Sequence, residues 1–145
     1  MSNIVLRRVI AYASEQGTSQ ALATSIGKST GIDVIDIKNL KIDELNLYSM
    51  IVFVVSTYGR GAPPSNCTEY WGSLESCNID CNTVNFAVLG VGSSNFRRSF
   101  LGFAKKLSDK MKSLGAKEVV PMGIHDETGE KSIDVQAWVQ SIGLN

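Results

Sequence analysis

Residues 88–96 read VLGVGSSNF, an apolar segment that continues into glycines and serines and ends at an aromatic side chain. The pattern indicates a strand that becomes a glycine-rich loop, with Phe96 at its end. Two earlier segments share this design. Residues 12–19 (YASEQGTS) are rich in hydroxyl groups, and residues 56–64 (STYGRGAPP) carry Tyr58. Three such loops at the ends of three strands indicate a site for a ligand with a phosphate and a flat ring.

Apolar runs alternate with helical patterns along the chain, which is typical of βαβ units around a parallel sheet. Residues 50–56 (MIVFVVS) are apolar almost without interruption, as in a central strand buried on both faces. Pro121 cannot donate a ladder hydrogen bond, so its strand is expected at a sheet edge. A doubly wound sheet places its ligand beyond the carboxyl ends of the strands. We expect strands at 4–12, 34–37, 50–56, 84–89 and 118–124, and helices at 18–30, 66–74, 99–114 and 135–142.

The helix boundaries carry their own signals. Gly31 and Gly115 are expected to stop the first and third helices. Asn66, with Glu69 three residues later, predicts a capped start of the second helix, which buries Cys67. The apolar residues of 99–114 recur at i, i+3, i+4 and i+7, which is typical of a helix with one buried face.

The bulk properties fit one domain over residues 1–145. With 43% hydrophobic residues, a chain of this length can build a full core. It has neither a long apolar run nor a signal-peptide layout, so we expect a cytoplasmic protein without a membrane partner. The three cysteines match neither zinc-site nor C-x-x-C spacing and are expected to be free thiols. Net charge is zero, although residues 97–117 hold seven basic residues and one acid.

The first loop offers groups that attract a phosphate. Ser14, Thr18 and Ser19 supply hydroxyls, Gly17 permits a tight turn, and the start of the following helix supplies free N–H groups. The loop lacks the lysine of the G-x-x-x-x-G-K-[ST] motif, which argues against a nucleoside triphosphatase. The alternative is a hydroxyl-capped helix without a ligand.

The second and third loops each place an aromatic ring where it can lie against a planar ligand. Stacking of Tyr58 and Phe96 on the two faces of a ring would contribute to binding and alter the electronic properties of the ring. The glycines beside them allow the backbone to approach the ring edge. The alternative is that each aromatic packs on the protein surface. We favour the ligand, flavin mononucleotide (FMN), because the two aromatics occupy matching loops.

The three loops resemble the flavin-binding segments of the flavodoxin-like family. They are most similar to the FMN domain of diflavin reductases of the cytochrome reductase, nitric oxide synthase reductase and sulfite reductase types. The resemblance runs from about residue 8 to the C-terminus. It is carried by residues 14–18 (SEQGT), 56–64 (STYGRGAPP) and 90–96 (GVGSSNF), with 114–116 (LGA) and 126–127 (DE) in support.

The resemblance implies an α/β fold, a flavodoxin-like three-layer sandwich. Its five-stranded parallel sheet would have the order 2-1-3-4-5, with helices on both faces. It also implies that Tyr58 and Phe96 enclose the isoalloxazine ring and that the Gly59 carbonyl faces its N5 atom. The residues expected at the cofactor are Ser14, Glu15, Gln16, Gly17, Thr18, Ser19, Ser56, Thr57, Tyr58, Gly59, Arg60, Gly61, Gly90, Val91, Gly92, Ser93, Phe96 and Asp126.

The chain departs from the family pattern at several positions. Gln16 replaces a usual threonine, and Phe96 replaces a usual tyrosine. Arg60, Arg97 and Arg98 stand where acidic residues, or in part histidine, are common in the family. One hypothesis is that these arginines surround the exposed ring edge and raise the second reduction potential. The alternative is that they point into solvent. An unchanged second potential in Arg60→Glu would contradict the hypothesis.

The functional prediction is a one-electron carrier, either free-standing or one domain of a longer reductase. It would accept electrons from a reductase with FAD and NAD(P)H and pass them to a haem or iron–sulfur protein. Whether the chain is itself an enzyme stays open at this point. The alternative is a small FMN-dependent NAD(P)H:quinone-type oxidoreductase. Neither nucleic acid nor metal is expected as a ligand, and we expect a monomer.

The histidine and the acidic residues near position 125 can be explained without a ligand. His125 is the one histidine and is expected in an exposed loop. Asp126, Glu127 and Glu130 precede the last helix, where acids are explained by the helix dipole.

Overall fold

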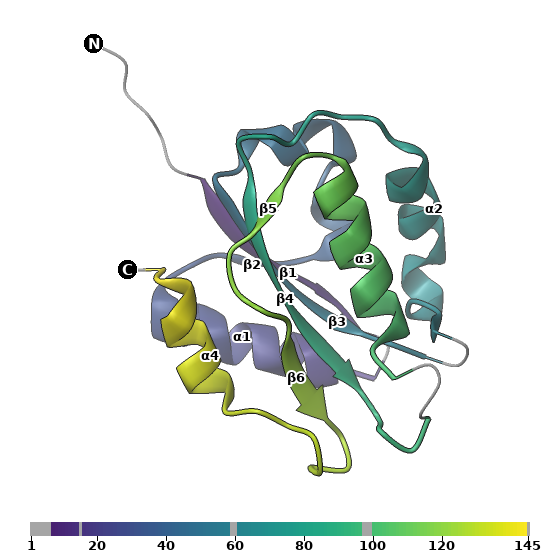
Figure 1. Cartoon of the computed structure of the whole chain (residues 1–145), viewed down its shortest axis with the longest axis vertical. Coiled ribbons are helices and arrows are strands. Elements are labelled where there is room, and N and C mark those ends of the chain that lie inside the picture. Colours follow the sequence, from purple (N-terminus) through teal and green to yellow (C-terminus); the bar gives the residue numbers. More distant parts are fainter. Residues whose placement is uncertain (1–6, 15, 59–60, 97–99, 145) are drawn as a thin grey trace.

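A parallel sheet forms the centre of the molecule (Figure 1). The structure is a computed structural model that describes residues 7–14, 16–58, 61–96 and 100–144. The strand order is β2-β1-β3-β4-β5, and β6 also pairs with β4. This confirms the predicted order 2-1-3-4-5. The strands are β1 (Arg8–Ala13), β2 (Val34–Asp36), β3 (Met50–Ser56), β4 (Asn85–Gly92), β5 (Lys117–Glu118) and β6 (Gly123–Asp126).

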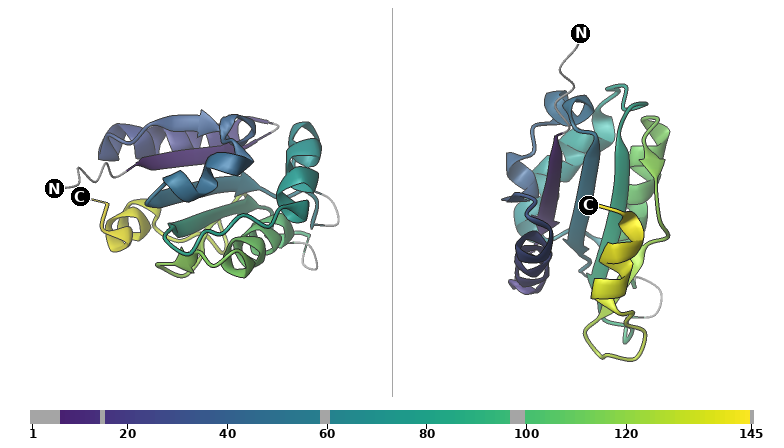
Figure 2. Two further views of the ribbon diagram at one scale, coloured as in Figure 1. Left: turned by 90° about the horizontal axis from the view of Figure 1, so that it is seen from above. Right: turned by 90° about the vertical axis from the view of Figure 1, so that its left-hand side faces the viewer.

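Helices cover both faces of the sheet and complete three layers, as predicted (Figure 2). α1 (Thr18–Thr30) and α4 (Val135–Ile142) lie on one face, and α2 (Thr68–Ser76) and α3 (Gly102–Ser113) on the other. Each face has its own core, because neighbouring residues of a strand point to opposite faces. Ile10, Val52 and Leu89 pack under α1 and α4, whereas Phe53, Phe86 and Val88 pack under α2 and α3.

β3 is the predicted central strand, with the predicted bounds. All seven of its residues are buried, and it pairs with β1 on one side and β4 on the other. The register places Ala13 beside Val55 and Ser56 beside Val91. The carboxyl ends of β1, β3 and β4 therefore meet at one edge, which brings the three loops together.

β4 and the last strand differ from the sequence prediction. β4 continues to Gly92 because residues 89–92 pair with residues 123–126, so Gly90 and Gly92 belong to a strand instead of a loop. The last strand is at the edge, as predicted, but is divided into β5 and β6. Pro121 lies in the interruption, where its carbonyl accepts a hydrogen bond from the Trp138 ring N–H at 3.0 Å.

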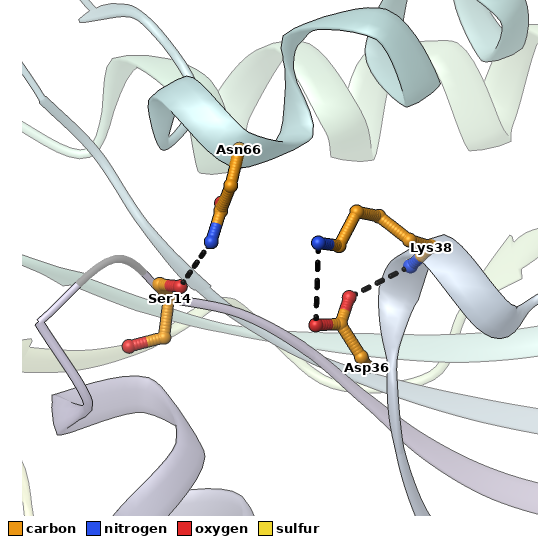
Figure 3. Close-up of polar contacts among 4 residues, drawn as sticks. All are labelled: Ser14, Asp36, Lys38 and Asn66. Carbon is orange, nitrogen blue, oxygen red and sulfur yellow. Dashed lines mark hydrogen bonds and ion pairs between the residues drawn. The ribbon is translucent and has the colours of Figure 1, made fainter.

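The predicted cap of the second helix is wrong. Asn66 lies in a 3-10 turn (Ser65–Cys67), and Cys67 precedes α2 without a side-chain cap. The Asn66 amide instead donates a hydrogen bond of 3.1 Å to the Ser14 carbonyl (Figure 3). Asp36, also drawn there, accepts a hydrogen bond from the Lys38 N–H at 2.9 Å and begins a 3-10 turn (Ile37–Asn39). A further 3-10 segment, η2 (Ile42–Leu47), leads to β3.

The remaining helix predictions hold in most details. α1 ends at Gly31, which has a left-handed φ of 74°. α3 begins at Gly102, later than predicted, after Leu101 in a left-handed conformation at φ 60°. No helix within the described ranges is long and apolar enough to span a membrane.

The three cysteines are free thiols, as predicted. Cys67 and Cys81 are buried, and burial raises the pKa of each thiol to about 11. Thiols that stay protonated are poor nucleophiles, so these two act as apolar core residues.

Candidate functional site

The three loops enclose one pocket at the carboxyl edge of the sheet. Its volume is about 270 Å³. Two residues before α3 and one after β6 complete its wall. The lining residues are Gln16, Thr57, Tyr58, Gly92, Ser93, Phe96, Phe100, Leu101 and Glu127. The sequence did not single out Phe100, Leu101 or Glu127 as lining residues, because their placement depends on where α3 begins and where β6 ends at the sheet edge.

The two aromatic side chains expected to flank a ring line the same pocket. Tyr58 is half-buried and Phe96 is 66% exposed. Phe96 is one of few large apolar side chains so exposed in the described chain. A large apolar surface left open at the mouth of a pocket is typical of a ligand-binding site. The structure therefore brings Tyr58 and Phe96 together, as a planar ligand requires.

The Tyr58 loop is held tightly against α3. The Tyr58 N–H donates to the Ala62 carbonyl at 2.8 Å, and the Gly61 N–H donates to the Tyr58 carbonyl at 3.1 Å. Gly61 has a φ of 74° and lies against Gly102, where an added Cβ would be 2.7 Å from the Gly61 Cα. Only glycine at position 102 permits this backbone approach. The start of α3 thus determines how closely the loop that carries Tyr58 packs against this helix.

Thr57 connects the second loop to both neighbouring elements. Its N–H donates to the Val91 carbonyl at 2.9 Å. Its hydroxyl oxygen accepts from the Phe103 N–H in the first turn of α3 at 3.1 Å. A hydroxyl group that accepts a bond still has its own hydrogen to donate. Thr57 can therefore offer a donor to the pocket while it fixes α3.

Asp126 holds the third loop in place. Its side chain is 2% exposed, and one oxygen accepts from the N–H groups of Ser94 and Thr128, at 3.0 Å each. The other accepts from the Lys131 N–H at 3.0 Å. Burial opposes ionisation, but the hydrogen bonds from Ser94 and Thr128 outweigh it and lower the pKa of the carboxyl. The carboxylate is thus directed at backbone amides of its own loops.

The helix-dipole explanation of the acids near residue 126 is wrong. α4 begins at Val135, and its cap is Asp134, which accepts from the Ala137 N–H at 3.2 Å. Asp126 ends β6, and His125 lies in the same strand instead of a loop. The Asp126 carboxylate is explained by the three amides around it.

The first loop presents the start of α1 to the same edge. Gly17 has a φ of 94°, and its N–H donates to the Ser14 hydroxyl at 2.8 Å. The first intrahelical bond runs from the Ala21 N–H to the Gly17 carbonyl. The N–H groups of residues 18–20 therefore have no acceptor within the helix. The first turn contains no acid, so this end of α1 suits an anion.

Several expected residues are buried and do not line the pocket. The Ser19 hydroxyl is fully buried and hydrogen-bonded to the Ser56 hydroxyl at 2.6 Å, so neither hydroxyl reaches the surface. Val91 is fully buried, and a Cβ on Gly90 would lie 2.9 Å from the Leu101 side chain. Glu15, Gly59, Arg60, Arg97 and Arg98 lie outside the described residues, and their expected roles stay predictions.

A second, shallower cavity of about 490 Å³ runs along α1 beside the pocket. Gln16 lines both cavities, so the first loop separates them. The other lining residues are Gly17, Thr18, Ala21, Leu22, Ser25 and His125.

These features fit FMN, which has a flat ring system and a terminal phosphate. Tyr58 and Phe96 would flank the ring, and the free N–H groups at the start of α1, with the Thr18 hydroxyl, would receive the phosphate. The close approach of Gly61 to Gly102 fixes the loop that carries Tyr58.

Comparison with known proteins gives relatives of two kinds. NADPH-dependent diflavin oxidoreductase 1 of Danio rerio is 30% identical over 143 residues, which cover 92% of this chain and 24% of that protein. NADPH–cytochrome P450 reductase of Rattus norvegicus is 26% identical over 144 residues, which cover 90% and 20%. The chain thus spans between a fifth and a quarter of the length of these relatives.

Solved flavodoxins share the fold. A cysteine-to-serine mutant of flavodoxin from Pseudomonas aeruginosa has a TM-score of 0.79 and 22% identity, covering 96% of this chain and 98% of that chain. Oxidised flavodoxin 2 from Bacillus cereus has a TM-score of 0.79 and 21% identity, covering 94% and 97%. The flavodoxin family model matches residues 10–138 of this chain. The chain therefore belongs to the flavodoxin family, whose cofactor is the FMN that the sequence predicts.

Proposed function

We propose that this chain binds FMN between Tyr58 and Phe96 and transfers single electrons between a reductase and a metal-containing acceptor. The observation that carries the proposal is the shared pocket of Tyr58 and Phe96 beside the start of α1. Bound FMN would supply the redox chemistry, and the protein would supply binding, orientation and tuning of the potential.

Different residues of the pocket would contact different parts of FMN. Tyr58 and Phe96 would contact the two faces of the ring. Thr57 and the backbone around Gly92 and Ser93 would meet its polar edge, because these residues line the same pocket as the two aromatics. Residues 14, 17 and 18, with Gln16 between the two cavities, would hold the phosphate.

The exposure of Phe96 supports a role in electron transfer between proteins. A ring that lies against this exposed side chain would lie close to the molecular surface. A partner protein could then approach the ring without a conformational change in the sheet. Such an arrangement suits a carrier better than an enzyme with a deep substrate chamber.

The relatives suggest the class of partner. One of them is named as a reductase of cytochrome P450 that uses NADPH. By analogy, the donor would be a reductase domain or protein with FAD and NAD(P)H, and the acceptor a haem or iron–sulfur protein. Residues 1–145 would form one FMN-binding domain, either by itself or within a longer chain.

Cofactor binding is the first test. Titration of the flavin-free protein with FMN, followed by quenching of flavin fluorescence, should give saturable binding with one site. Phe96→Ala and Tyr58→Ala should each raise the Kd by about tenfold, since an aromatic stack contributes about 0.5–1.5 kcal/mol beyond its buried area. Leu47→Ala is a matched control, because Leu47 is 52% exposed in η2. Equal FMN affinity in all three variants would contradict the site.

Electron transfer is tested by anaerobic mixing of the FMN-loaded protein with NADPH. A carrier should keep its flavin absorption until a catalytic amount of an FAD-containing reductase is added. Rapid bleaching by NADPH alone, with turnover of a quinone, would contradict the carrier and favour the quinone-type oxidoreductase.

A further inference from the structure

His125 lines the same cavity as the anion-attracting end of α1. β6 alternates its side chains between the faces of the sheet. Gly123 packs on Trp138 of α4, and Ile124 packs on the core under α2 and α3. The His125 side chain therefore lies on the same face as Gly123, the face covered by α1 and α4. His125 is two residues closer than Gly123 to the carboxyl end of β6. There it lines the second cavity together with Gly17 and Thr18.

The imidazole is the one titratable side chain among the described residues that line this cavity. Across the cavity, α1 contributes Gly17, Thr18, Leu22 and Ser25, none of them charged. On the neighbouring strand β4, its register partner is Val91. A positive charge on His125 would therefore act on whatever anion occupies the start of α1.

The charged groups of the described residues around His125 are directed elsewhere. The Asp126 carboxylate accepts from the amides of Ser94, Thr128 and Lys131, and Glu127 lines the other pocket. α4, which packs against β6, carries one acid at its start, Asp134, which is bonded to the Ala137 N–H. The basic residue of α1, Lys28, lies in the last turn of the helix, away from the cavity lining.

We propose that His125 is a further contact for the phosphate of FMN, so that the protein binds FMN more tightly when the imidazole is protonated. The inference rests on the proposed function. The N–H groups of residues 18–20 and the Thr18 hydroxyl provide the permanent part of the phosphate site, without any lysine or arginine among the described residues of the first loop. His125 adds the part that depends on pH, because histidine changes its charge between pH 5 and 8.

The direction of the effect follows from linkage. If protonation of His125 strengthens FMN binding, FMN must favour protonation of His125 by the same factor. FMN affinity should then rise as the pH falls from 8.5 to 6.5. Riboflavin has the same ring and no phosphate, so its affinity should not follow this trend. Below about pH 6 the phosphate itself takes up a proton, and the range is therefore kept above that point.

The decisive measurement uses the wild-type protein. His125 is the one histidine of the chain, so every imidazole signal in the NMR spectrum of the protein without an affinity tag comes from this residue. The midpoint of its titration should lie about half a unit to one unit higher in the FMN complex than in the riboflavin complex. Equal midpoints in the two complexes would overturn the inference.

A variant gives an independent check. The FMN Kd of His125→Gln should match that of the wild type at pH 8.5 and be roughly two- to fourfold higher at pH 6.5. Lys28→Gln removes a cation from the far end of the same helix and should match the wild type at both values. An identical pH dependence in wild type and His125→Gln would overturn the inference. If neither flavin binds, the proposed function fails as well. If both bind and the imidazole signal does not respond to the phosphate, only this inference fails.

Discussion

The hydroxyl groups of Ser19 and Ser56 lie 2.6 Å apart in a buried hydrogen bond that joins the first turn of α1 to the last residue of β3. The first loop ends at Ser19, and the second begins at Ser56. The bond thus fixes the loop that carries Tyr58 relative to the start of α1.

Ser19→Ala should lower the free energy of unfolding by about 1–3 kcal/mol, because it leaves the Ser56 hydroxyl buried without its partner. Ser56→Ala should have a similar effect. The double variant should lose less than the sum of the two, since the second substitution removes the group left unpaired. Urea unfolding measures all three. Thr24→Ala on the exposed side of α1 is the control and should stay within about 0.5 kcal/mol of the wild type. Strict additivity would contradict the pairing.

Gly102→Ala should destabilise the protein by about 1–3 kcal/mol and weaken FMN binding. The new Cβ would lie 2.7 Å from the Gly61 Cα, so the backbone of one segment must shift. Gly72→Ala in α2 is the matched substitution, because no atom lies within 4 Å of the new Cβ. It should stabilise the helix by about 0.5–1 kcal/mol. Thermal unfolding and FMN titration of both variants check the contrast, and equal behaviour would refute the close approach.

Asn66→Ala should weaken FMN binding several-fold with a loss of stability below about 1 kcal/mol. The Asn66 amide is exposed and holds the Ser14 carbonyl at 3.1 Å, and a single exposed hydrogen bond contributes little to folding. The Ser14 hydroxyl in turn accepts from the Gly17 N–H, so the tether orients the turn before α1. Asn46→Ala in η2 is the control. The tether is refuted if both variants bind FMN equally.

Asp126→Asn should reduce stability at neutral pH, and the difference from the wild type should shrink in acid. The pKa of the Asp126 carboxyl is lowered in the folded protein, so the ionised form stabilises the fold. This contribution is complete above the ordinary aspartate pKa of about 4 and is lost as the pH falls further. Urea midpoints between pH 7 and pH 3 measure it. Asp109→Asn, on the exposed face of α3, should show no such convergence. A constant difference for Asp126→Asn would contradict the assignment.

The parts of the fold that depend on local pattern could be predicted from the sequence. β3 has the expected bounds because its seven residues are all apolar or small and all buried. α1 ends where Gly31 supplies a left-handed residue. In both cases the signal and its structural cause lie within a few adjacent residues.

The parts that depend on tertiary contacts could not be predicted. The sequence around Asn66 is typical of a helix cap, but the Asn66 side chain instead donates a hydrogen bond to the carbonyl of Ser14, which is far away in the chain. Leu101 takes a left-handed conformation that its type does not favour. In the candidate site, the pairing of Tyr58 with Phe96 follows from the parallel sheet, whereas the inward turn of Ser19 and the position of His125 follow from packing between α1, β3 and β6.

The division of the last strand at Pro121 has a consequence for the protein in a crowded solution. One border of the sheet is formed by β5 and β6, of two and four residues, and the opposite border by β2, of three. Each offers an incoming strand too few adjacent donors and acceptors to build a lasting ladder. The protein is thereby protected against strand exchange and fibre formation at both ends of its sheet, even though the strands between them are almost wholly apolar.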